Sequence, residues 1–138
     1  MSVDASDVKE AVASLRQYMQ DLLLEFVQCP SLQGKEKSAQ DVMERVLSRD
    51  LHMKIDRWAL DEKALSSLRG FSPVSWSLEH SECVVGTYEA ADLSAKSLIV
   101  NGHVDVVPVQ PSNQWTRSPF DAYVKDGWLY GRGSGDMK

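Results

Sequence analysis

The feature that most constrains the fold is the segment from Ser97 to Asp105, which reads SLIVNGHVD. Its first half is apolar at consecutive positions, so an extended strand there would present apolar side chains on both faces. Such a strand is typical of the interior of a sheet whose two faces are both covered. The segment therefore predicts a central strand in an α/β protein, with helices packed on the sheet.

The rest of the chain supplies helices and further strands for such a sheet. Apolar residues recur every three or four positions from Asp7 to Gln28 and from Lys37 to Arg49, which predicts two amphipathic helices. Asp7, with Glu10 after it, is expected to cap the first helix, and Pro30 to end it. The pattern also predicts strands at 52–58, 83–88 and 128–130, a short helix at 61–69 and a loop over 71–82.

Composition argues against several classes of function. Fifteen Lys and Arg against twenty Asp and Glu give a net charge of −5, and the basic residues are scattered, so no nucleic-acid partner is expected. The apolar runs fall far short of the ~20 residues that cross a bilayer, so no membrane partner is expected either. The acidic N-terminus differs from a secretory signal, and Cys29 and Cys83 are interpreted as free or buried thiols. Together these features predict a cytoplasmic protein.

The polar end of the apolar segment carries the first candidate site. His103 and Asp105 are two positions apart in the expected strand, so both side chains point to one face, about 6.5–7 Å apart along the chain. Strand ends in open α/β sheets are where binding sites form. Asp105 could ligate a metal beside His103, or hold the imidazole and set which nitrogen faces the metal. A structural His–Asp hydrogen bond would give the same pattern.

The second candidate site is the glycine-rich segment 130–136, Tyr-Gly-Arg-Gly-Ser-Gly-Asp. Its glycines permit close backbone approach. A dinucleotide-binding loop would need glycine where Asp136 stands, and a serine nucleophile elbow would need glycines on both sides of Ser134 at positions 132 and 136. Neither pattern fits. What remains is a carboxylate presented by a tight loop after a strand, or an aspartate that only bonds turn amides.

The other histidines and the aromatic residues of the second half are expected to be structural. His52 and His80 lie in polar surroundings typical of the surface. Trp115, Phe120 and Trp128 are expected to pack under a loop and not to stack on a ligand.

Three segments in order resemble a single family pattern. They are SLIVNGHVDVVP at 97–108, WTRSPF at 115–120 and DGWLYGRGSGDMK at 126–138. Together they resemble the M20-type metallopeptidase and deacylase family, which includes acetylornithine deacetylase, succinyl-diaminopimelate desuccinylase, aminoacylase and carboxypeptidase G. The first segment is most similar to acetylornithine deacetylases.

The resemblance implies a three-layer α/β/α catalytic domain that hydrolyses an amide bond with metal-activated water. His103 matches a histidine that binds one of two zinc ions, Asp136 the aspartate that bridges both, and Asp105 the catalytic aspartate that orients the histidine. Cobalt or manganese could replace zinc. A cis peptide bond after Asp136 is also implied. The expected substrates are N-acyl amino acids such as N-acetylornithine, and a dipeptidase or carboxypeptidase of the same family is the alternative.

In that family the general-base glutamate, the other metal ligands and the lid and dimerisation domain correspond to positions after Lys138. Residues 1–138 are therefore expected to be the N-terminal portion of a single catalytic domain, truncated before the lid and dimerisation domain and inactive alone. The complete protein could be a homodimer. Because two ligands fall short of the three that a catalytic zinc site uses, a non-catalytic remnant with at most weak metal binding is the alternative from another functional class.

Overall fold

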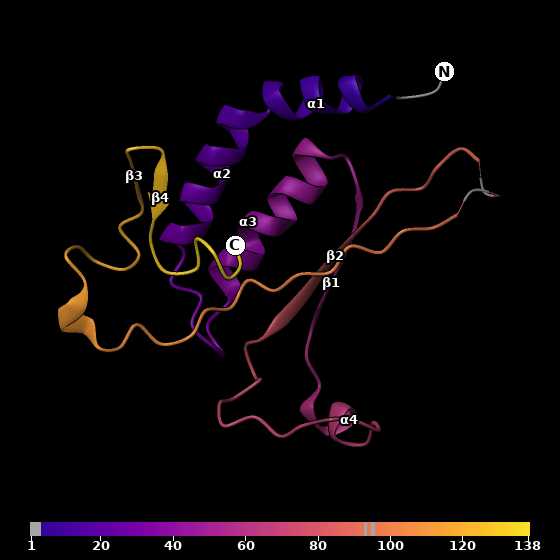
Figure 1. Ribbon diagram of the computed structural model, residues 1–138. Coiled ribbons are helices and arrows are strands. Elements are labelled where there is room, and N and C mark those ends of the chain that lie inside the picture. The colour runs from indigo at the N-terminus through magenta and orange to yellow at the C-terminus, as the bar shows by residue number, and fades with distance from the viewer. Residues whose placement is uncertain (1–3, 93, 95) are drawn as a thin grey trace.

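The computed structural model describes residues 4–92, 94 and 96–138, which form helices and two small antiparallel sheets (Figure 1). The helices are α1 (Ala5–Ser14), α2 (Arg16–Gln28), α3 (Lys37–Arg45) and α4 (Glu62–Ser66), with a π-helical turn η1 (Val46–Asp50) and a 3-10 turn η2 (Ser112–Gln114). The strands are β1 (Lys54–Ala59), β2 (Glu82–Thr87), β3 (Tyr123–Lys125) and β4 (Trp128–Tyr130). The predicted α/β class is confirmed.

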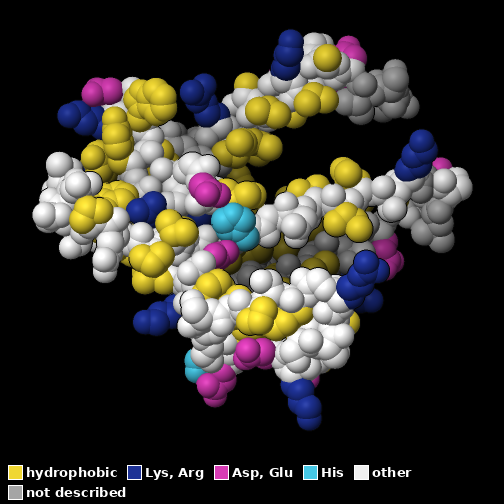
Figure 2. Space-filling view, turned by 60° about the horizontal axis from the view of Figure 1, so that its bottom comes forward, with side chains coloured by type: hydrophobic (Ala, Val, Ile, Leu, Met, Phe, Trp, Pro, Cys, Tyr) yellow, Lys and Arg dark blue, Asp and Glu magenta, His cyan; other side chains and the backbone are white. Residues whose placement is uncertain are grey.

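The first predicted helix is two helices that meet at Leu15. The Ser14 hydroxyl donates to the Ala11 carbonyl at 2.7 Å, a bond within the helix that competes with the backbone ladder and bends helices. The N-cap is Asp4 and not Asp7, because the Asp4 carboxylate accepts from the backbone of Asp7 and the Asp7 carboxylate accepts from the backbone of Asp4. α1 buries none of its residues, and Figure 2 shows hydrophobic side chains gathered along it.

The core lies between α2 and α3, which run side by side (Figure 1). Its buried residues are Phe26, Ala39, Val42 and Val46. Val104 packs against this cluster from the distant segment that carries His103. The core therefore anchors that segment beside the end of α2.

Arg57 links the β1–β2 sheet to α3, together with Gln40, whose side-chain amide donates to the Glu82 carbonyl at 2.9 Å. The Arg57 guanidinium donates to Glu82 on β2 and, at 2.6 Å and 2.8 Å, contacts Glu44 and Asp41 on α3. Only 19% of the Arg57 side chain is exposed. These hydrogen bonds raise the pKa of Arg57 above its ordinary value, and the bond to Glu82 has the largest effect. The charged arginine thus joins both strands to the helix.

The other predicted elements are found with small shifts. The strand expected at 52–58 is β1 at 54–59, the strand at 83–88 is β2 at 82–87, and the strand at 128–130 is β4. The helix expected to end at Arg49 gives way to a π-helical turn after Arg45. β3 has no counterpart among the predicted elements and forms a hairpin with β4.

The predicted central strand is wrong for the part of the chain that the structure describes. Residues 97–105 belong to no strand, and Leu98, Ile99 and Val100 are 86%, 89% and 88% exposed. The first bridge follows at Val106, which pairs in parallel with Leu32. A strand needs a neighbour for its hydrogen bonds, and β1 and β2 pair with each other instead. The apolar sequence alone does not supply that neighbour.

Two further expectations concern membranes and cysteines. Among the described residues, no helix is long and apolar enough to cross a bilayer. Cys29 and Cys83 are free thiols, each partly exposed.

Candidate metal centre

His103 and Asp105 form a hydrogen-bonded pair. The imidazole Nδ1 lies 3.1 Å from the Asp105 carboxylate and 3.2 Å from the Asp105 backbone carbonyl. Both of these partners can only accept when the carboxylate is ionised, so Nδ1 carries the proton. A neutral ring then presents the lone pair of Nε2 on its other side. The side chain of His103 is 49% exposed, so a ligand can reach this nitrogen from solvent.

The lone pair of Nε2 faces a second carboxylate. Asp136 Oδ1 lies 3.4 Å from Nε2, and the Asp136 side chain is 90% exposed. Two acceptors at this distance repel each other unless a proton or a metal cation lies between them. The structure therefore brings together the three residues predicted from the sequence, and Figure 2 shows a histidine flanked by acidic side chains at the surface.

The glycines allow the loop that carries Asp136 to pack closely against neighbouring segments. A side chain at Gly131 would place its Cβ 2.2 Å from Val27 of α2. Gly133 has a φ of +92°, and a Cβ there would lie 2.8 Å from Val106. Only glycine permits both the backbone angle and the close approach. The loop can therefore lie against α2 and against the segment that carries His103.

The donor atoms fit one metal ion. Two atoms that bind a tetrahedral zinc ion at about 2.0–2.2 Å lie about 3.3–3.6 Å apart, and Nε2 of His103 is 3.4 Å from Oδ1 of Asp136. Asp105 occupies the outer position in which a carboxylate fixes the tautomer of a metal-bound histidine. Imidazole and carboxylate are both ligands that zinc accepts.

The described residues contain no group of three or more His, Cys, Asp or Glu side chains arranged to hold a metal. The chain thus offers two donors from different segments, as the sequence indicated. The cis bond implied after Asp136 is a wrong prediction, because in the described ranges the one cis bond is Gln110–Pro111.

The sequence missed two residues that support the site. The fully buried Ser31 donates its hydroxyl to the Val104 carbonyl, and the Lys138 ammonium donates to the carbonyls of Phe26 and Cys29. Burial lowers the pKa of Lys138. Neither residue stands out in the sequence, because their partners are distant along the chain.

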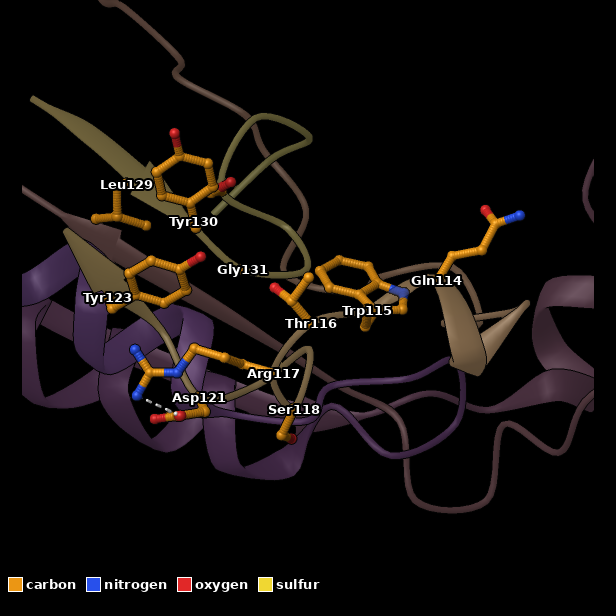
Figure 3. A pocket seen from close by; sticks show the side chains of 11 residues that line it. Gln114, Trp115, Thr116, Arg117, Ser118, Asp121, Tyr123, Leu129, Tyr130 and Gly131 are labelled. Atoms are coloured by element: carbon orange, nitrogen blue, oxygen red, sulfur yellow. Dashed lines mark ion pairs between the residues drawn. The ribbon is translucent and has the colours of Figure 1, made fainter. Parts of the chain in front are cut away.

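A pocket of about 310 Å³ lies beside the glycine-rich loop (Figure 3). Tyr123 and Tyr130 stack there with ring centroids 5.0 Å apart, and the Arg117 guanidinium lies 4.5 Å above the Tyr123 ring while pairing with Asp121 at 2.8 Å. The cation is thus already paired within the pocket wall.

The remaining predictions on histidines and tryptophans have mixed outcomes. His52 and His80 are exposed, as predicted. Trp115 is partly buried and lies 5.2 Å from the Arg132 guanidinium. Trp128 is 72% exposed, so its predicted packing under a loop is wrong. Successive side chains of a strand point to opposite faces of the hairpin, and the Trp128 indole lies on the face exposed to solvent.

Comparison with known proteins points to one family. Residues 99–138 match the model of peptidase family M20/M25/M40. A succinyl-diaminopimelate desuccinylase of Cereibacter sphaeroides is 34% identical over 117 residues, which are 85% of this chain and 26% of the relative. One from Parvibaculum lavamentivorans is 33% identical over 118 residues, 86% of this chain and 26% of the relative. One from Stenotrophomonas maltophilia is 52% identical over 46 residues, 33% of this chain and 12% of the relative.

The chain spans about a quarter of the length of the first two of these relatives, at 26% of each. The family match includes the whole arrangement described above: His103, Asp105 and the glycine-rich loop with Asp136 all fall within residues 99–138. Relatives that match over the first half as well extend the similarity to α2 and α3. The segment that carries the candidate ligands is therefore similar to peptidase family M20/M25/M40.

Proposed function

We propose that this chain contributes His103 and Asp136 as metal ligands of an amide hydrolase. The observation that carries the proposal is the imidazole held between two carboxylates, with Nε2 and Asp136 Oδ1 3.4 Å apart. A proton on Nδ1 satisfies Asp105, and a cation shared by Nε2 and Asp136 would remove the repulsion between the other two acceptors. The similarity of residues 99–138 to peptidase family M20/M25/M40 supports the same role for these residues.

The chain's own residues have distinct tasks in this proposal. Asp105 keeps the proton on Nδ1 and orients the ring, so that Nε2 always presents its lone pair to the metal. Asp136 neutralises part of the cation's charge, and its high exposure leaves its carboxylate available to a second ion. When bound, zinc polarises the scissile carbonyl and lowers the pKa of a water toward ~7, and two ions can share these roles.

The proposed substrates are N-acyl amino acids. The relatives are named succinyl-diaminopimelate desuccinylases, which makes an N-succinyl amino acid the first substrate to test. N-acetylornithine, which the sequence pattern favours, is the second, and a dipeptide is the third. The order of turnover among these three compounds decides between a deacylase and a peptidase.

The cellular setting is proposed on the same basis. We propose that residues 1–138 are the N-terminal portion of a single catalytic domain and that the protein works in the cytoplasm, where free thiols such as Cys29 and Cys83 are kept reduced. A homodimer is proposed for the complete protein from the family resemblance. Zinc is proposed as the metal, with cobalt or manganese as substitutes.

The first test replaces one proposed ligand. His103→Ala in the full-length protein should lower bound zinc per chain and reduce hydrolysis of N-succinyl-diaminopimelate about 100-fold or more, because a catalytic zinc needs all its ligands. His80→Ala is the matched control, since His80 is also exposed. Zinc content by plasma mass spectrometry and amine release report the two effects.

The outcomes separate the proposal from its rival. Full zinc content and activity in His103→Ala would contradict the ligand assignment. A wild-type protein that binds zinc weakly and hydrolyses none of the three compounds would favour the non-catalytic remnant. Activity lost together with zinc, in His103→Ala but not in His80→Ala, is the expected result.

A further inference from the structure

The end of α2 touches both segments that carry the candidate ligands. Residues 26–32 leave the helix through the Pro30 turn and meet the chain near His103 on one side and near Asp136 on the other. These contacts join positions more than seventy residues apart in sequence. They are the part of the site that the proposed function does not yet explain.

Ser31 holds the first segment by two hydrogen bonds. Its hydroxyl donates to the Val104 carbonyl at 2.5 Å, and its own carbonyl accepts from the Val106 backbone amide at 2.9 Å. The two bonded groups lie immediately before and after Asp105. Ser31 is 0% exposed and Val106 is 2% exposed, so water does not compete for these bonds. The backbone is thus fixed on both sides of Asp105 and directly after His103.

Lys138 holds the second segment at the same place. Its ammonium donates to the Phe26 carbonyl at 2.8 Å and to the Cys29 carbonyl at the C-terminal end of α2, and each of these carbonyls also accepts from one backbone amide. A cation is favourable at this end of a helix. Its backbone amide donates to the Gly133 carbonyl at 3.0 Å, which closes the loop around Asp136.

We propose that Ser31 and Lys138 are positioning residues, which use the end of α2 as a common base to hold His103, Asp105 and Asp136 in register. The ligand role of these three residues rests on the proposed function. The positioning itself does not, because it concerns the geometry of the protein without metal. His103 is half exposed and Asp136 is more exposed still, so their own packing contributes little to fixing them.

The test compares loss of the anchoring group with its conservative replacement. Ser31→Ala removes the hydroxyl and Ser31→Thr retains it; Lys138→Met removes the charge and Lys138→Arg retains it. The matched control for the serine is Ser67→Ala, because Ser67 also donates its hydroxyl to a backbone carbonyl, that of Ala64 at 2.7 Å, but at the end of α4. Lys125→Met on the β3–β4 hairpin is the control for the lysine.

Two readouts are measured on the full-length protein. The first is the two-bond ¹H–¹⁵N spectrum of the imidazole rings without metal, which reports the tautomer of His103. The rings of His52 and His80 serve as internal references. The second is the affinity for zinc alone by calorimetry. Circular dichroism and the thermal midpoint verify that each variant is folded.

The expected result is selective. Ser31→Ala and Lys138→Met weaken zinc binding about 10-fold or more, the range for loss of groups that orient ligands. Ser31→Ala also moves the His103 ring signals while those of His52 and His80 stay in place. Ser31→Thr and Lys138→Arg restore at least part of the affinity, and both controls resemble the wild type.

Other outcomes overturn the inference or the proposed function separately. If Ser31→Ala and Lys138→Met are folded and keep wild-type His103 signals and zinc affinity, the two residues are only structural and the positioning role is wrong. If Ser31→Ala does not fold, Lys138→Met and Lys138→Arg decide the question by the same two readouts. If the wild type itself binds no zinc, the ligand assignment fails, and the His103 signals still decide whether Ser31 positions the ring.

Discussion

At the residue scale, the candidate site depends on which group each of the two ring nitrogens of His103 faces. Asp105 lies 3.1 Å from Nδ1 and Asp136 lies 3.4 Å from Nε2, so a carboxylate faces each side of the ring. The spacing of His103 and Asp105 in sequence predicted that they share a face. The chemistry of Asp136 could not be predicted from spacing alone, because it lies across a loop whose course depends on contacts with α2.

The residue-scale prediction concerns Asp105. Asp105→Ala removes the acceptor that keeps the proton on Nδ1, so the ring is free to rotate and to change tautomer. Zinc affinity should fall about 10–100-fold. The thermal midpoint should change little, because the partner of Asp105 is the half-exposed His103 ring and such pairs contribute little to stability. Calorimetry with zinc measures the affinity. Asp126→Ala, on the β3–β4 turn, is the control, and equal losses in both variants would contradict the role.

At the element scale, periodicity predicted which segments are helical better than where they end. The stripe from Val8 to Phe26 continues through the junction of α1 and α2 at Leu15, and nothing in that stripe indicates the junction. The N-cap is Asp4 and not the expected Asp7, because two aspartates three positions apart can each act as N-cap and the sequence pattern does not choose between them. The strand expected at 97–105 failed because pairing depends on a second segment.

The element-scale prediction concerns acid stability of the joint between α3 and β1. Hydrogen bonds from Lys37 and Arg57 lower the pKa of Asp41 below its ordinary value, and the bond from Lys37 has the larger effect. A carboxylate whose pKa is lower in the folded state stabilises the fold above its unfolded pKa of ~3.9, and this contribution disappears as the pH falls through the folded pKa.

The wild type should therefore lose stability on acidification below about pH 4 more steeply than Asp41→Asn does. The difference should stay below about 1 kcal/mol, because the Asp41 side chain is 47% exposed and solvent screens the pair. Urea unfolding at a series of pH values measures it, with Glu10→Gln on the exposed helix α1 as the control. Parallel pH profiles for the wild type and Asp41→Asn would show that Asp41 makes no such contribution.

At the scale of the whole molecule, the resemblance to one family was recognisable from sequence because the matching segment is local. Residues 99–138 contain the histidine segment and the glycine-rich loop without interruption. The contacts that align these two segments could not be recognised in the sequence. Ser31 and Lys138 bond to backbone carbonyls, which every residue has, so no residue type marks their partners. Sequence patterns thus locate candidate ligands more readily than the residues that hold them in place.

The whole-molecule prediction concerns the exposed apolar run at 98–100. Leu98, Ile99 and Val100 are each more than four-fifths exposed, at 86%, 89% and 88%, and their backbone lies outside any ladder of the described residues. An exposed run of apolar side chains favours association between chains. The chain of 138 residues should therefore self-associate, and Ile99→Asp should shift it toward the monomer in sedimentation experiments. Leu68→Asp, at a position 60% exposed, is the control; a monomeric wild type would contradict the prediction.

The central claim is that Nε2 of His103 and the carboxylate of Asp136 bind the same metal ion. The most direct measurement is a zinc titration of the full-length protein, followed through the ¹⁵N signals of the histidine rings. Zinc should shift the Nε2 signal of His103, leave His52 and His80 unchanged, and bind at least about 10-fold more weakly in Asp136→Ala. A His103 signal that stays in place while zinc binds, or an affinity unchanged by Asp136→Ala, would contradict the claim.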